Sequence, residues 1–176
     1  LGDRIVVKNK QSGVTMQAVV TAVLKLFGDY LERHILEEGG HDEWILDDAE
    51  VLGIQRRALL ERIPTRTALQ LVGSQYYWIY HYNPVAMLGY IAVMEGTPPE
   101  SELIEDVARR NKLPLEAFSS FLRHAKIDPG HRADLDLLLD ILPLSNEQLG
   151  LIGLSALQTI QYLTAVLTDV NTSHLC

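Results

Sequence analysis

Residues 19–44 read VVTAVLKLFGDYLERHILEEGGHDEW, and this stretch decides the fold class. Its apolar residues recur every three or four positions, which places them on one face of an α-helix. The pattern predicts a long helix that begins after Gly13 and continues through His41 and Trp44. Gly39 and Gly40 weaken such a helix by roughly 1 kcal/mol each unless packing requires small residues there.

The rest of the chain carries the same helical periodicity, interrupted by capping residues, glycines and prolines. Thr65 and Ser145 are placed to cap helices, and Pro84 is placed to kink one. Only Arg4–Val7 resembles a strand. Six or seven helices with short connections predict an all-α bundle. The further helices are expected over residues 47–62, 65–94, 101–111, 115–126, 128–142 and 145–170.

Composition predicts one domain over residues 1–176, in a reducing, cytoplasmic setting. The only cysteine is Cys176, so no disulfide framework can be drawn. A formal net charge of -8 argues against nucleic-acid or anionic-membrane binding. Residues 67–94 and 148–168 contain no Asp, Glu, Lys or Arg, but both contain several other polar residues. We therefore expect helices buried in a bundle and no membrane span.

The first candidate site lies around the two glycines, at His34, Glu37, Glu38 and His41. On a continuous helix, His34, Glu38 and His41 share one stripe, and Glu37 and His41 begin a neighbouring stripe that continues to Trp44 and Asp48. A Glu three residues before a His can place a carboxylate and an imidazole on one metal, as in di-iron bundles. Both residue types are also common on exposed helix faces, so this pair alone is weak evidence.

The second candidate site is the triplet His124, Asp128 and His131. Its spacing of four and three residues forms one helical stripe, and two imidazoles with one carboxylate are a common ligand set for non-haem iron. Pro129 disfavours helical geometry at Asp128. An equally weighted alternative is that Asp128 only caps a helix that begins at Pro129, while His131 faces water.

Glu95 is the third candidate, because it ends the long uncharged stretch and would be costly to bury unpaired. The alternative is an exposed glutamate at a helix end. We expect Glu95 to face the bundle interior beside His41 and His124. A di-iron site needs about six carboxylate and imidazole ligands. The three sites together supply six such residues: Glu38, His41, Glu95, His124, Asp128 and His131.

These motifs resemble those of the haem-oxygenase-like di-iron oxidases, a family also described as iron-containing redox enzymes. His34–Trp44, followed by Asp47-Asp48 and Leu52-Gly53, resembles the family signature. Tyr76–Pro99 resembles the central helix, and the His124, Asp128, His131 spacing matches the last ligand helix. The resemblance covers roughly residues 17–170, with the motifs in the family's order.

The resemblance implies a seven-helix haem-oxygenase-like fold and a non-haem oxidoreductase with two irons, Fe(II) or Fe(III), and O2 as co-substrate. The implied reaction oxidises a small organic acid or amine by decarboxylation, carbon–carbon cleavage or N-oxygenation. By position, the implied ligands are the six residues named above. His34 stands where some members have a glutamate, and Glu37 could replace Glu38 if the helix is distorted. Most members have another helix before the first motif, and that helix could be missing here.

Two other functions remain open at this stage. A non-enzymatic module could bind haem or a small ligand, with His34 or His81 as the axial ligand. A thiaminase-like hydrolase would need a nucleophile such as Cys176, and no base is positioned for it by the sequence. The expected partner is a small-molecule substrate. The sequence leaves a homodimer open.

Overall fold

A computed structural model describes residues 16–172, and it describes side chains over residues 24–169. The described chain is all-helical and contains no strand, which confirms the predicted fold class. The predictions for Arg4–Val7, the missing first helix and Cys176 lie outside the described residues.

Within the described residues, seven α-helices have nine or more residues: α1 Met16–Glu37, α2 His41–Val51, α4 Arg66–His81, α5 Met87–Glu95, α6 Ser101–Asn111, α7 Ser119–Ile141 and α8 Asn146–Thr172. The five-residue helix α3 (Arg56–Leu60) and the 3-10 turns η1 (Pro84–Ala86) and η2 (Leu115–Phe118) connect them.

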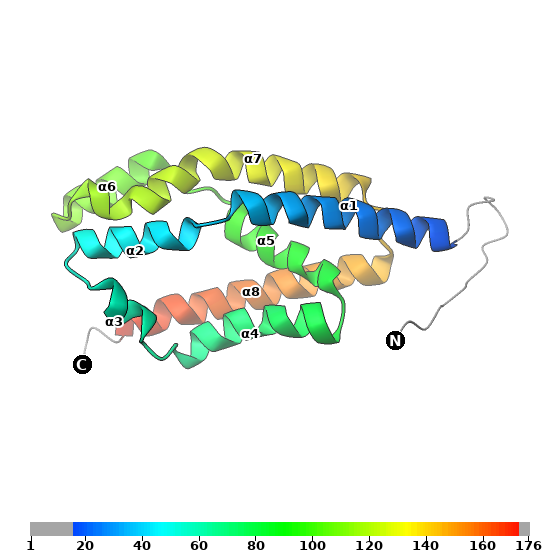
Figure 1. Cartoon of the computed structure of the whole chain (residues 1–176), viewed down its shortest axis with the longest axis horizontal. Helices are drawn as coiled ribbons and strands as arrows, with labels where there is room; N and C mark the ends of the chain where they lie inside the picture. The colour runs from blue at the N-terminus through cyan, green and yellow to red at the C-terminus, as the bar shows by residue number, and fades with distance from the viewer. Residues whose placement is uncertain (1–15, 173–176) are drawn as a thin grey trace.

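The helices form two layers with α5 crossing between them. Figure 1 shows α1 and α7 side by side in one layer, with α2 continuing from α1, and α4 and α8 side by side in the other. Helix α5 packs against both α8 and α7. Its residues Leu88 and Ile91 are buried in the core with Phe27 of α1 and Leu135 of α7. The C-terminal end of α5 therefore lies between the two layers.

Close contact between α5 and α8 depends on Gly89. A Cβ atom at Gly89 would lie 2.1 Å from the carbonyl oxygen of Ile152 and 2.8 Å from the amide nitrogen of Ala156. Only glycine allows the two backbones to approach this closely.

The prediction of one helix through His41 and Trp44 is wrong. Helix α1 ends at Glu37, and α2 begins at His41 after a short break. Gly40 adopts φ +88°, the left-handed region that glycine enters without steric cost. The second predicted helix breaks in the same way, because Gly53 adopts φ +79° between α2 and α3. In the third, the chain leaves helical geometry at Tyr82 and resumes through η1, so Pro84 separates α4 from α5.

A predicted helix boundary at Asp128-Pro129 is also wrong, because α7 runs from Ser119 to Ile141 with Pro129 inside it. Pro129 is exposed, whereas Asp128 and His131 are buried on the inner face. Packing of this face overrides the local preference of the residue before proline. The His124, Asp128, His131 stripe therefore exists as one helical face.

Several helix ends agree with the sequence. Thr65 Oγ1 accepts a hydrogen bond from the Ala68 amide, and α6 has the predicted bounds. Ser145, predicted to cap a helix, does so at the start of α8, where it forms a reciprocal capping box with Gln148 at distances of 2.9 and 3.2 Å.

The expectation that the uncharged helices are buried holds for one face only. Helix α8 buries Ser155 and Thr159, but Leu157 is 68% exposed because α8 lies at the edge of the described bundle. Within the described residues, one helix is long and apolar enough to cross a membrane by length and composition, over Asn146–Asp169.

Candidate metal centre

Glu38 occupies the break between α1 and α2, where its carboxylate contacts histidines of two different helices. Glu38 Oε2 accepts a hydrogen bond from His41 Nδ1 at 2.8 Å. Glu38 Oε1 lies 3.3 Å from Nδ1 of His131, on α7. The predicted Glu-x-x-His pair therefore exists, although a glycine turn rather than a continuous helix brings its two residues together.

Glu95 is the last residue of α5 and points into the bundle, with its side chain 15% exposed. Its Oε1 atom lies 3.1 Å from His34 Nε2, and its Oε2 atom lies 3.2 Å from His131 Nδ1. The inward orientation agrees with the sequence expectation, but the imidazoles in direct contact are those of His34 and His131 instead of His41 and His124. The crossing of α5 beneath α1 and α7 determines these partners.

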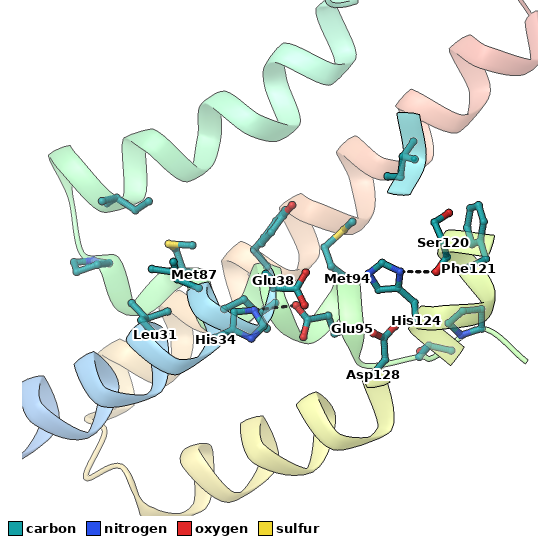
Figure 2. Close-up of a pocket in the computed structure, with 18 residues that line it drawn as sticks. Leu31, His34, Glu38, Met87, Met94, Glu95, Ser120, Phe121, His124 and Asp128 are labelled. Atoms are coloured by element: carbon teal, nitrogen blue, oxygen red, sulfur yellow. Dashed lines mark hydrogen bonds and ion pairs between the residues drawn. The ribbon is translucent and has the colours of Figure 1, made fainter. Parts of the chain in front are cut away.

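His124 and Asp128 complete the inner face of α7. His124 Nδ1 donates a hydrogen bond to the Ser120 carbonyl oxygen at 2.8 Å, because that oxygen can only accept. Its ring meets the His41 ring edge-on at 5.1 Å between centroids. Asp128 is 3% exposed and lines the same cavity as His34, Glu38, Glu95 and His124 (Figure 2).

Two groups of three residues have ligand atoms that all lie within 4.8 Å of one another, close enough to hold a metal ion. One group is Glu38, His41 and His124, and the other is Glu38, Glu95 and His131. Glu38 is the residue that these two groups share.

A third group of the same kind contains His34, Glu37 and His131. Glu37 does not line the cavity, its side chain is 41% exposed, and its Oε2 atom lies 3.7 Å from His131 Nε2. Of the two glutamates that the sequence left open, Glu38 therefore has the interior position and Glu37 has the outer one.

Four buried atoms of this cluster make no hydrogen bond: Glu38 Oε1, Glu95 Oε2, Asp128 Oδ1 and His131 Nδ1. Burying such atoms without hydrogen bonds is costly, and burying several carboxylates together adds repulsion. Burial raises the pKa of Asp128. A hydrogen bond to Glu95 raises the pKa of His34. Bound cations would satisfy the unpaired atoms and neutralise the carboxylates, so the residues present fit a metal centre.

The cluster forms one wall of a cavity of about 810 Å³ whose other walls are mostly apolar. Figure 2 shows Leu31, Met87, Met94 and Phe121 around it. Among the described residues that line it, those that carry charge or can gain one are His34, Glu38, Tyr90, Glu95, His124 and Asp128, and none is a Lys or Arg. The cavity is open to solvent at Ile35 and Phe121, which are 67% and 55% exposed.

Sequence reasoning missed Tyr30, which stands one helical turn before His34. Its ring stacks on the His34 ring with centroids 5.4 Å apart, and its buried hydroxyl makes no hydrogen bond. Burial and the nearby Glu95 carboxylate raise the pKa of Tyr30 above the ordinary tyrosine range. The spacing of four residues could have identified it as a neighbour of His34.

Fold and site together define an all-helical protein with a buried carboxylate–histidine cluster suited to a non-haem metal. The chain belongs to the family described as iron-containing redox enzymes, whose model matches residues 14–163. Iron is therefore the metal that the family match suggests for this cluster.

A crystal structure of a domain of unknown function from Shewanella denitrificans OS217, with a heme oxygenase-like fold, is similar to this chain with a TM-score of 0.74 and 22% identity. The match covers 81% of this chain and 62% of that one, so the present chain spans about three fifths of its length. A similarity at this identity confirms the haem-oxygenase-like fold. A comparison with curated proteins gave no match.

Proposed function

We propose that the chain is a non-haem di-iron oxidase that uses O2 to oxidise a small organic acid or amine. The observation that carries this proposal is the position of Glu38, which belongs to two ligand groups at once. A carboxylate shared in this way, with histidines on both sides, is the arrangement that di-iron bundles use.

In this proposal Glu38, His41 and His124 hold one iron, and Glu38, Glu95 and His131 hold the other. Asp128 lies on the same face of α7 between His124 and His131, and it can serve either position. His34 contacts Glu95 and is a further candidate. The four unpaired buried atoms support this assignment, because ligation would satisfy each of them.

When bound, two ferrous ions would supply the two electrons that begin O2 reduction. The carboxylates favour the harder, oxidised iron, and the imidazoles keep the ferrous form bound. Before metal binds, the raised pKa values of His34 and Asp128 favour the protonated form of each. The apolar walls would limit the contact of water with the reacting groups.

The cavity supports a substrate with an apolar body and one polar head. Apolar side chains such as Leu31, Met87 and Phe121 would contact the body. The described lining offers a substrate carboxylate no Lys or Arg partner, so an acid would direct its head to the metals, whereas an amine could also pair with Asp128 or Glu95. Both classes therefore remain within the proposal.

Non-enzymatic haem binding finds less support. An axial histidine must present a free ring nitrogen to an apolar pocket. His34 Nε2 is paired with Glu95, and His81 is exposed at the end of α4. A porphyrin placed in the cavity would also contact several buried carboxylates.

Anaerobic titration with Fe(II) tests the proposal. Wild-type protein should bind close to two irons per chain, and Glu95→Ala and His124→Ala should each remove at least one, because each deletes a ligand. His81→Ala is the matched control and should bind as wild type does. Wild-type iron binding in both ligand variants would contradict the assignment.

Oxidation is tested separately, by measuring O2 consumption of the iron-loaded protein with a panel of fatty acids, amino acids and alkylamines. Uptake that one compound accelerates would identify the substrate class. No uptake under any condition would refute the oxidase function and favour ligand binding.

A further inference from the structure

Asp48 is a buried carboxylate in α2 that binds the first turn of α7. It is 6% exposed, and Ser119 donates to its Oδ1 atom from the amide at 3.1 Å and from the hydroxyl at 2.6 Å. The Ser120 amide donates to Oδ2 at 3.0 Å, and the Ser120 hydroxyl donates to the same atom. Hydrogen bonds to a charged acceptor are the stronger kind, and amides at a helix N-terminus favour negative charge.

The same first turn of α7 orients His124. The Ser120 carbonyl oxygen accepts the hydrogen bond from His124 Nδ1, so the neutral imidazole must carry its proton on Nδ1 and leave Nε2 as the atom able to bind a metal. Asp48 accepts two hydrogen bonds from Ser120. It therefore holds in place the residue whose carbonyl oxygen determines the tautomer of His124.

His41, Trp44 and Asp48 form one stripe of α2 that faces α7. The Trp44 ring stacks on His41 at 3.8 Å and meets His124 edge-on at 5.7 Å. The guanidinium of Arg123 also lies over the Trp44 ring, 4.7 Å from its centroid. The stripe therefore fixes the position of α2 along α7, with Asp48 making its four hydrogen bonds.

We infer that Asp48 is a positioning residue for the metal position formed by Glu38, His41 and His124. It does not line the cavity, so it acts through Ser120 and through the packing of α2 on α7. The other position, formed by Glu38, Glu95 and His131, contains no residue of α2 and should be less affected. The inference rests on the proposed function where metal binding is measured. The effect of Asp48 on His124 can be measured without metal.

The test compares Asp48→Asn with Thr67→Val. An asparagine places an NH2 group against serine amides that need an acceptor, so it disrupts the network with little change of volume. Thr67→Val removes a different buried side-chain hydrogen bond, from Thr67 to Asp169, which joins α4 to α8 away from the centre.

Co(II) titration, followed by its visible absorption, measures each metal position. In Asp48→Asn we expect affinity at one position to fall about ten- to hundredfold, the range for removal of an outer partner of a metal ligand. Thr67→Val should bind as wild type does.

The metal-free readout is the nitrogen-15 NMR spectrum of the His124 ring, at a pH where free imidazole is neutral. Wild-type protein should show the Nδ1–H tautomer, and Asp48→Asn should shift toward the Nε2–H form. If Asp48→Asn does not fold, Ser120→Ala replaces it, because that variant loses one hydroxyl bond but keeps the Ser120 amide and carbonyl. It should show a smaller change in the same direction.

Unchanged Co(II) affinity together with an unchanged His124 tautomer in the folded variant would overturn the inference. Equal weakening of both metal positions, or the same loss in Thr67→Val, would also overturn it, since either result indicates a general effect of stability. If no variant and no wild type binds metal, the proposed function fails, and the tautomer measurement still decides the role of Asp48.

Discussion

Glu37 and Glu38 are adjacent in sequence and lie in opposite surroundings. Glu38 faces the cavity and contacts His41 and His131, while Glu37 faces outward beside Arg33. Because Glu38 belongs to both metal groups, Glu38→Ala should lower bound iron to well below one per chain. Glu37→Ala is the matched control and should retain most of the iron.

The stability of the metal-free proteins separates these roles further. Glu38 Oε1 makes no hydrogen bond and lies among other buried carboxylates, whereas Oε2 accepts one from His41, so removal of the side chain should change the free energy of unfolding only slightly. A large loss of stability in metal-free Glu38→Ala would indicate a structural carboxylate instead of a ligand.

Asp48 should also make the protein sensitive to acid. Burial alone would raise the pKa of Asp48, but the hydrogen bonds from Ser119 and Ser120 outweigh burial and lower it. A lowered folded pKa contributes stability that is present above the unfolded value of about 3.9 and is lost as the pH falls through the folded value. The stability advantage of wild type over Asp48→Asn should therefore be constant above about pH 5 and shrink below pH 4. Urea unfolding at a series of pH values measures it, and an advantage that grows in acid would contradict it.

The sequence predicted most residues that lie together in the candidate site, but it did not predict which of them contact one another. His124, Asp128 and His131 follow from helical spacing on one helix, and Glu95 follows from the cost of burying a charge. The imidazoles that Glu95 contacts depend on the angle at which α5 crosses α1 and α7. No local sequence pattern predicts that angle. Tyr30 was missed because an aromatic residue at helical spacing usually indicates only core packing.

At the scale of elements, the break between α1 and α2 places Glu38 where it can reach both His41 and His131. The break depends on Gly40, whose φ of +88° is unfavourable for any residue with a Cβ atom. Gly40→Ala should destabilise the protein by about 1–2 kcal/mol without a clash, since nothing lies within 4 Å of the added Cβ. Gly28→Ala, inside α1 with equally open space and no positive φ, is the control and should stabilise by about 0.5–1 kcal/mol. Equal effects of the two changes in urea unfolding would rule out strain at the break.

Local helix signals in this sequence were right where they concern capping and wrong where they compete with packing. The Thr65 cap and the Ser145–Gln148 box need only neighbouring backbone, so they could be predicted. Gly39-Gly40 permits either a weakened helix or a turn, and the site's geometry requires the turn. Pro129 permits a helix start, yet buried Asp128 and His131 keep α7 continuous.

At the scale of the molecule, the centre depends on two layers held together through α5. Gly89→Ala would drive a Cβ into the backbone of α8, and backbone atoms cannot rotate away. Overpacking typically costs about 1–3 kcal/mol, and we expect at least the upper end here. The displaced α5 would also move Glu95, so metal binding should weaken in parallel. Gly153→Ala, on α8 with open space around it, is the control. Wild-type thermal stability in Gly89→Ala would contradict the close contact.

The layered fold brings α1, α2, α5 and α7 to one cavity. The proposed iron centre depends on all four helices. The most direct test is iron analysis combined with EPR, on protein loaded anaerobically with Fe(II) and then exposed to O2. We expect close to two irons per chain and an oxidised state without an EPR signal, because two ferric ions that share the Glu38 carboxylate couple to a spin-zero ground state. One iron per chain with the EPR signal of an isolated ferric ion, or no bound iron at all, would contradict a di-iron centre.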